Sequence, residues 1–303
     1  MNESLFINII IGISIASVPL IFAAIGELLV ERSGVLNLGV EGMMIVGALL
    51  GFVVMSHTQN PYLAVLSAML GGMVIASIFA FLTQFLLTNQ VATGLALTLF
   101  GLGFAAFAGR GYTEETIQLI TAVPIPYLSD IPYLGPLLFS FNPLVYLAFF
   151  MVYLVWWFLF KTKQGLILRA IGDNHDAAHA IGHNVVRYRV MAILFGGAMA
   201  GIGGAFLSLV QVPIWGEGMT AGRGWIALGL VVFASWQPFR IIFGAILFGG
   251  ITILQIHAQG LNINVSAQYL SMLPYLATIV ILVSLRMRLK NKTNRTVPNC
   301  LGR

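Results

Sequence analysis

Long apolar stretches separated by short polar segments run along nearly the whole chain. Several approach the ~20 residues that a helix needs to cross the hydrocarbon core of a bilayer, and they lack the two-residue alternation of a membrane β-strand. The stretch 225–236 is short, which is typical of a half-helix or of a helix that begins earlier, near Met219. Together the stretches predict about nine spans, at residues 5–29, 35–55, 62–87, 92–108, 143–160, 190–210, 225–236, 241–257 and 270–285.

The composition points to the same fold class. Of the 303 residues, 59% are hydrophobic and 8% are charged, whereas about a quarter of the residues of a soluble domain are charged. We therefore predict an all-α fold, a polytopic transmembrane helical bundle, with one membrane domain over residues 1–290 and a polar tail over residues 291–303. The basic residues are spread over loops and tail, which argues against nucleic acid as a partner. Cys300 is the only cysteine in the sequence, so an intrachain disulfide is excluded.

The placement of charge predicts the orientation in the membrane. Basic residues concentrate in the loop 161–189 and in the tail from Arg286 onward, and such segments stay in the cytoplasm. The loop 110–142 carries three acidic residues against one arginine and is expected outside. An outside N-terminus and a cytoplasmic C-terminus follow. The outer loop is rich in proline and aromatic residues, which favours a cap of short interfacial pieces, either a mere connector or a docking surface for an external partner.

One early span is interrupted by polar residues and glycines. Residues 34–47 read GVLNLGVEGMMIVG, and they place Asn37 and Glu41 in an apolar run that continues to Met55 without another charge. An ionisable side chain at membrane depth is costly and normally faces protein or a water-filled path. Glycines there allow close helix contacts or an unwound backbone. We therefore expect this segment to do more than cross the lipid. A structural alternative is an ion pair between Glu41 and Arg223 that stabilises the bundle.

A segment later in the chain has a weakly similar pattern, which would make the two an internal repeat. The string from Glu41 to Gly47 and the string from Arg223 to Gly229 each consist of a charge, a glycine, four apolar residues and a second glycine. In the predicted topology the two segments run in opposite directions. Inverted repeats with glycine-interrupted spans point to a transport path. With 33 glycines in the chain, chance similarity is the alternative.

The cytoplasmic loop contains a short helix pattern. Asp173 or Asn174 is suited to cap its N-terminus, and Gly182 to end it. A small apolar stripe on such a helix fits a groove on a partner protein, whereas the alternative is a solvated connector. Histidines 175, 179 and 183 are spaced along one face, but the glycine stop makes a solvated face a better interpretation than a metal site. The residues assigned to partner coupling are Asp173, Asn174, Ala177, Ala178, Ile181 and Gly182.

Two other patterns bear on function. Five glycines between positions 196 and 204 crowd one span, which predicts helix packing rather than ligand binding. The sequence contains no GxxxxGK[ST] motif, so we do not expect ATP to bind through a P-loop. With no nucleophile–base pair in view, the chain is not predicted to be an enzyme, and any energy comes from another subunit or from an ion gradient.

These motifs resemble those of inner-membrane permease subunits of ABC importers in the branched-chain amino acid, ribose and nucleoside group. GVLNLGVEGMMIVG is similar to the family's signature after an early span. The form LNLGVEGMM, with EGMTAGRGWIALG at residues 217–229, resembles the nucleoside and simple-sugar branch, most closely its purine-nucleoside permeases. RAIGDNHDAAHAIGHNV at residues 169–185 resembles the family's coupling loop, although three histidines replace more usual residues. The likeness covers about residues 5–285.

The resemblance implies a multi-pass permease in the cell (inner) membrane that pairs with a second, related permease or with a copy of itself. It implies separate ATPase subunits that bind ATP and magnesium, an extracytoplasmic substrate-binding protein and a nucleoside substrate, with no cofactor in this chain. Ribose-type sugars and branched-chain amino acids remain alternatives, as do an ion-coupled carrier, a passive channel and a non-transporting receptor. The residues that the resemblance assigns to the translocation pathway are Asn37, Glu41, Glu217, Thr220, Arg223 and Trp225.

Overall fold

The computed structural model describes residues 2–124, 126, 128, 129, 131, 134–260, 272, 276, 279, 280, 283 and 297–302. Across these residues the regular structure is helical, with one isolated bridge between Thr116 and Ile214. The long helices are α1 (Asn2–Arg32), α2 (Val40–Thr58), α3 (Pro61–Ala80), α4 (Gln90–Gly109), α6 (Pro143–Lys161), α9 (Val185–Phe206) and α11 (Pro238–Gly260). The short helices are α5 (Leu134–Leu138), α7 (Lys163–Asp173), α8 (His175–Ala180) and α10 (Arg223–Phe233).

The prediction of an all-α membrane bundle is confirmed. Within the described residues, seven helices are long and apolar enough to cross a membrane, and they coincide with seven of the nine predicted stretches. The short stretch 225–236 corresponds to α10, which has only 11 residues, as a half-helix requires. The stretch 270–285 lies largely outside the described residues. The count of nine spans and the orientation therefore stay predictions.

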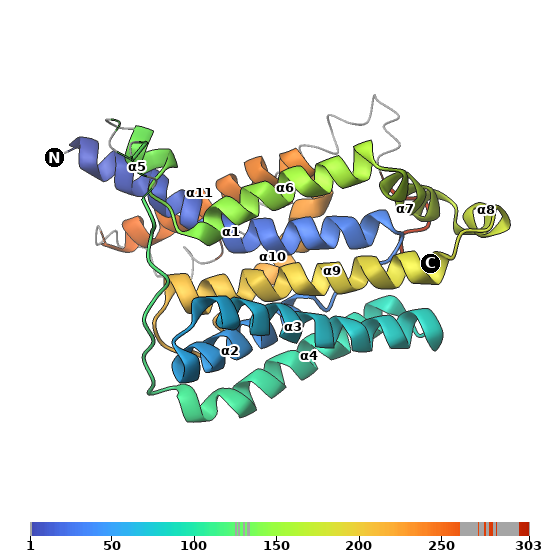
Figure 1. The fold of residues 1–303 in the computed structure, drawn as a ribbon, viewed down its shortest axis with the longest axis horizontal. Helices are drawn as coiled ribbons and strands as arrows, with labels where there is room; N and C mark the ends of the chain where they lie inside the picture. The colour runs from blue at the N-terminus through green and yellow to red at the C-terminus, as the bar shows by residue number, and fades with distance from the viewer. Residues whose placement is uncertain are drawn as a thin grey trace.

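The long helices run roughly parallel, with α9 in the middle of the bundle (Figure 1). Helix α9 packs against α1 on one side and against α2 and α3 on the other, while α4 lies outside α2 and α6 lies outside α1. One end of the bundle, called here the α8 end, carries α7, α8 and the C-terminal residues 297–302. The opposite end, called the α5 end, carries the N-terminus and α5.

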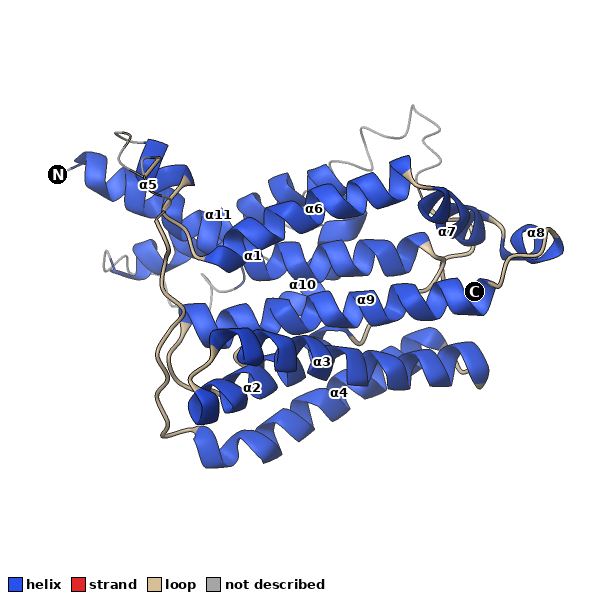
Figure 2. Cartoon of the chain, in the orientation of Figure 1, coloured by secondary structure: helices blue, strands red, loops and turns tan. Residues whose placement is uncertain are grey.

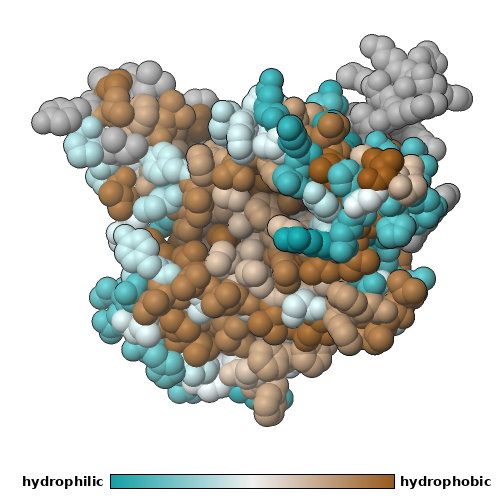
Figure 3. All heavy atoms as spheres, turned by 45° about the vertical axis from the view of Figure 1, so that its right-hand side comes forward, coloured by the Kyte–Doolittle hydropathy of each residue, from teal (hydrophilic) through white to brown (hydrophobic). Residues whose placement is uncertain are grey.

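The surface matches a lipid environment. Figure 3 shows a broad apolar face across the middle of the molecule, with hydrophilic atoms gathered toward its ends. Large apolar side chains are also exposed on helices at different sides of the bundle, among them Leu99 of α4 and Phe243 of α11 at 71% and 70%. Exposed apolar side chains of this density would be unfavourable in water, and lipid covers them without cost.

Asparagines fix where several helices begin. A side-chain oxygen at the residue before a helix accepts a first-turn N–H that has no partner within the helix. Asn60 and Asn142 each precede a proline at the first helical position, which suits a residue that has no N–H to satisfy. The asparagines that cap in this way are Asn60, Asn89, Asn142, Asn174 and Asn184.

The loop 110–142 crosses the α5 end of the bundle, and most of its described residues lie outside helices (Figure 2). Its backbone is held by other elements: the Ile120 N–H donates to the Leu209 carbonyl at 2.8 Å, and the Asn142 side-chain amide donates to the Ile120 carbonyl at 2.6 Å. Its described regular pieces are a 3₁₀ turn, Arg110–Tyr112, and α5. This arrangement agrees with the predicted cap of short pieces. A docking role for this cap stays a prediction.

Glycines on α9 allow its neighbours to approach to backbone contact. A Cβ atom on Gly201 would overlap the Ala68 carbonyl oxygen of α3, and one on Gly204 would overlap the Met44 carbonyl oxygen of α2. Close approach of this kind increases the dispersion contacts between helices. Helices in lipid depend on such contacts because no hydrophobic driving force brings them together. The predicted packing role of the glycines between positions 196 and 204 is therefore confirmed.

Replacing Gly201 by leucine should destabilise the bundle, because overpacking a filled interface costs at least about 1–3 kcal/mol. Gly103→Leu is the matched control, since a Cβ at this exposed position of α4 meets no atom within 4 Å. Thermal unfolding in detergent should show a lower midpoint for Gly201→Leu and an unchanged one for Gly103→Leu. Equal midpoints for the two variants would contradict the packing assignment.

Candidate functional site

The Glu41 carboxylate lies inside the bundle and is only 3% exposed. Its Oε1 accepts the Thr220 hydroxyl at 2.6 Å and the Gly222 N–H at 2.9 Å, and its Oε2 accepts the Gly224 N–H at 2.6 Å. Three donors from one distant segment therefore surround a single carboxylate. These three donors give each of the two carboxylate oxygens at least one hydrogen bond.

The donors belong to the N-terminus of α10. First-turn N–H groups have no helical partner and carry the positive end of the helix dipole, so they favour an anion. The position before the helix is Gly222, with φ +77° and no side chain to supply a cap. Glu41 from α2 supplies the acceptor instead. A Cβ on Gly224 would lie 2.6 Å from the Glu41 Cα, so this contact requires glycine.

Two helices thus begin next to each other in the interior and leave in opposite directions. Helix α2 ends beside Tyr112 at the α5 end, where His57 contacts the Tyr112 hydroxyl at 3.0 Å. Helix α10 leads to Trp236, whose carbonyl accepts Arg32 Nη2 at 2.8 Å at the α8 end. The two segments with the similar sequence pattern, 41–47 and 223–229, meet at Glu41 and Gly224. This geometry is that expected of an inverted repeat, although the repeat itself stays a prediction.

The other predicted pathway residues have different surroundings. Thr220 is fully buried against Glu41, and the Arg223 guanidinium donates to the carbonyls of Met219 and Thr220 at 3.0 and 3.3 Å. Trp225 is 38% exposed, and Glu217 is exposed in the segment before α10. The structure therefore brings Glu41, Thr220 and Arg223 to one place, while Trp225 and Glu217 face outward. Their roles in a pathway stay predictions.

Asn37 shapes the loop that precedes α2. The residue is fully buried, its Oδ1 accepts the Gly39 N–H at 2.9 Å, and its own N–H donates to Glu27 Oε1 at 3.2 Å. An asparagine that bonds the backbone two residues ahead forms an Asx turn. In this structure Asn37 therefore positions the start of α2, and its side chain is already engaged within the protein.

Sequence reasoning missed two buried carboxylates, Glu27 and Glu31, at the α8 end of α1. They are 1% and 2% exposed. Glu31 Oε2 accepts the Trp236 indole N–H at 2.6 Å, whereas Glu27 Oε2 has no hydrogen-bond partner among the described residues. Two acids four residues apart share one helix face, and this spacing at the end of an apolar run was the available signal. They place a polar layer between the loop before α2 and the α10–α11 turn.

The short helix of the loop 161–189 is α8, and Asn174 is its cap, with Oδ1 accepting the Ala177 N–H at 3.0 Å. Gly182 follows the helix with φ +91°, as the predicted stop requires. Asp173 instead ends α7. The expected single apolar stripe is divided: Ala178 is 2% exposed and faces the protein, while Ala177 is exposed and Ile181 is 74% exposed.

Residues 297–302 return to the bundle beside α8. The Cys300 N–H donates to the Gly172 carbonyl at 2.9 Å, and the Gly302 N–H donates to the Gly34 carbonyl at 3.1 Å. The Cys300 thiol lies 3.3 Å from His175 Nδ1 at the start of α8. This C-terminal segment therefore joins α7 and α8 to the turn after α1, which leads through Asn37 to Glu41.

Comparison with known proteins agrees with this architecture. Residues 9–283 match the family described as "Branched-chain amino acid transport system / permease component". The chain belongs to this permease family. It is an integral membrane protein and a transport component of the ABC type rather than an enzyme.

Three relatives cover most of the chain. A putative glucose ABC transporter permease of Haloferax volcanii is 41% identical over 289 residues, 88% of each chain. A nucleoside ABC transporter permease of Lactococcus lactis is 32% identical over 90% of each chain, and a guanosine ABC transporter permease of Bacillus subtilis is 31% identical over 94% of each. No solved structure matches the chain.

Replacing Glu41 by leucine should destabilise the protein, because the N–H groups of Gly222 and Gly224 and the Thr220 hydroxyl would lose their buried acceptor. Each unsatisfied buried group costs about 1–3 kcal/mol. Thermal unfolding in detergent should show a clear fall in the midpoint. The exposed residue Glu217 provides the control, since Glu217→Leu should leave the midpoint nearly unchanged. A Glu41→Leu variant as stable as the wild type would rule out the capping role.

Proposed function

We propose that this permease forms the membrane pathway of an ABC importer for nucleosides, with purine nucleosides favoured. A separate subunit hydrolyses ATP bound with magnesium, and an extracytoplasmic binding protein delivers the substrate. The proposal rests above all on one observation: an exposed short helix at one end of the bundle is connected through hydrogen-bonded segments to a buried carboxylate where two helices begin. The family relationship and the two nucleoside relatives support it.

In this proposal the α8 end faces the cytoplasm, and α8 docks on the ATPase. Ala177 and Ile181 present a small apolar surface that fits a groove on that subunit. A second permease, related or identical, completes the pathway. The α5 end, with its loop 110–142, faces the binding protein on the outside.

Movement of α8 would reach the interior through contacts described above. Cys300 contacts Gly172 of α7 and His175 of α8, and Gly302 donates to Gly34. Arg189 of α9 donates to the Ser33 carbonyl at 3.2 Å. The contacts at Gly34 and Ser33 hold the turn from which the loop to Glu41 begins. A displacement of α8 would therefore shift the start of α2 against the start of α10, which is where access to the pathway would alternate.

The polar groups near this junction suit a hydroxylated cargo. Carboxylate, hydroxyl and amide groups can hydrogen-bond sugar hydroxyls, and the exposed indole of Trp225 offers a surface for stacking on a base. Glu41 and Thr220 are engaged with each other in the present arrangement. In the proposal they exchange these bonds for substrate when the two helix starts separate.

A monosaccharide is the second candidate substrate. The Haloferax volcanii relative, at 41% identity, is named as a putative glucose permease. The same hydroxyl-binding groups would serve glucose, whereas stacking on Trp225 would contribute to binding a base. The two candidates therefore differ in what they require of this tryptophan.

Uptake into vesicles that contain the reconstituted importer tests both substrates. Radiolabelled guanosine should accumulate with ATP, and unlabelled nucleosides should compete better than ribose or glucose. Trp225→Leu should reduce guanosine uptake while Trp157→Leu, a change at an exposed position of α6, should not. Competition by glucose alone would replace the nucleoside by a monosaccharide. Uptake that survives loss of the ATPase but collapses with the proton gradient would contradict the importer.

Replacing Ala177 by glutamate should uncouple ATP hydrolysis from uptake, because a charge at this exposed position disturbs the apolar docking surface without burying a charge in the permease. Ala178→Glu is the informative contrast, since Ala178 is buried and this change should lower the unfolding midpoint itself. Substrate-stimulated ATPase activity and uptake would be measured on the assembled complex. Normal uptake by a well-folded Ala177→Glu variant would exclude α8 as the docking helix.

A further inference from the structure

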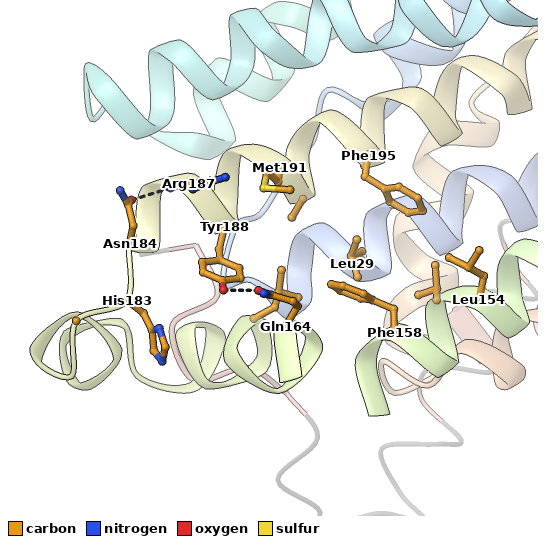
Figure 4. Close-up of a pocket in the computed structure, with 14 residues that line it drawn as sticks. Leu29, Leu154, Phe158, Gln164, His183, Asn184, Arg187, Tyr188, Met191 and Phe195 are labelled. Carbon is orange, nitrogen blue, oxygen red and sulfur yellow. Dashed lines mark hydrogen bonds between the residues drawn. The ribbon is translucent and has the colours of Figure 1, made fainter. Parts of the chain in front are cut away.

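A cavity of about 610 Å³ opens between α1, α6, α7 and α9, away from the Glu41 junction (Figure 4). Volumes of this size hold single small ligands. Neither Glu41 nor any of its three donors lines the cavity. The cavity is therefore separate from the junction at which the proposed cargo would bind.

The lining has two chemically different parts. Figure 4 shows Leu29, Leu154, Phe158 and Phe195 around one end, where α1, α6 and α9 meet. This end offers no hydrogen-bonding side chain among the residues that line it, so a polar solute would lose its hydration without compensation. A hydrocarbon chain would fit the same surface at no such cost.

The other end of the cavity is polar and basic. Gln164, Asn184, Arg187 and Tyr188 lie together there, on α7 and at the start of α9 (Figure 4). The Tyr188 hydroxyl donates to Gln164, and the Arg187 backbone N–H donates to Asn184 at 3.0 Å. Arg187 itself is exposed, and the described residues that line the cavity include no carboxylate.

Two further cations lie close in sequence to this rim. Lys161 ends α6 and Lys163 begins α7, immediately before Gln164, and both are exposed. The cytoplasmic leaflet is negatively charged, and basic pockets between membrane helices on that side bind anionic lipid headgroups. Among the described lining residues Arg187 is the one cation, and the Lys161 ammonium lies over the Trp156 ring, 5.8 Å from its centroid. An arginine at the polar end of a mostly apolar cavity, where α6 ends and α7 begins, is complementary to an anionic phospholipid in charge and in polarity.

We propose that this cavity binds one anionic phospholipid of the cytoplasmic leaflet, with its phosphate near Arg187 and an acyl chain between α6 and α9. The assignment to this leaflet rests on the proposed function, which turns the α8 end toward the cytoplasm. The bound lipid would hold the start of α9 against α6, next to Gly182 and His183, which follow α8. The lipid composition of the membrane would then influence the stability of the position of α8 on the bundle.

Native mass spectrometry of the full chain in detergent tests the site without any need for transport. Phosphatidylglycerol and phosphatidylcholine with the same acyl chains serve as probes. The wild type should retain phosphatidylglycerol preferentially, and Arg187→Glu should reduce its retention by at least about tenfold, since the local charge changes by two. Arg110→Glu, the same charge change at the opposite end of the bundle, should have no effect. Unfolding midpoints equal to that of the wild type establish that both variants are folded.

A second variant tests the apolar end. Leu154→Trp fills part of the cavity and should weaken phosphatidylglycerol retention while leaving Arg187 in place. Equal retention of the two lipids by the wild type, or unchanged retention in Arg187→Glu, would overturn the proposal. Displacement of the lipid by millimolar inorganic phosphate would assign the rim to a soluble anion instead and would also overturn it. Failure of nucleoside uptake would leave the binding result unaffected, so the two proposals fail separately.

Discussion

The structure depends on a carboxylate that serves as the cap of a helix from a different part of the chain. Glu41 lies 179 to 183 residues from its donors, and it satisfies backbone groups that would otherwise face a medium without water. In lipid each unsatisfied backbone group costs several kcal/mol. The bundle can therefore contain a helix that starts in its interior because Glu41 accepts hydrogen bonds from the start of α10. It can contain the charge of Glu41 because the start of α10 supplies the donors.

The surroundings of this junction are made rigid by glycine. Helix α9 brings α1, α2 and α3 to backbone contact, so the central helices form a unit with little room to rearrange. By contrast, the segment before α10 has residues with positive φ at Gly218, Ala221 and Gly222. The proposed change of access is therefore assigned to the α2–α10 junction and not to the glycine-packed core.

The sequence was a good guide where the governing interactions are local. Span positions follow from length and apolarity, and the start and end of α8 follow from Asn174 and Gly182, whose chemistry acts within three or four residues. The unusual character of Glu41 was also visible, because one charge in an apolar run is conspicuous. Its partners were not visible, since nothing local pairs it with Gly222 and Gly224.

Side-chain direction on short elements was the main source of error. Ala177 and Ala178 are adjacent and chemically identical, so only the packing of α8 decides that the first faces out and the second faces in. Residues 297–302 have no periodic pattern. Their docking depends on hydrogen bonds to the backbone carbonyls of Gly34 and Gly172, which no sequence motif predicts. Glu27 and Glu31 were overlooked because they lie at a span end, where charges are common.

The docked position of residues 297–302 has a practical consequence for handling this protein. Leu301 packs against the apolar core, and Gly302 sits beside Leu36. A purification handle or a fluorescent reporter attached close behind Gly302 would start next to α8, where the ATPase is proposed to bind. Fusions at the other terminus, which extends from the opposite end of the bundle, would keep that surface clear.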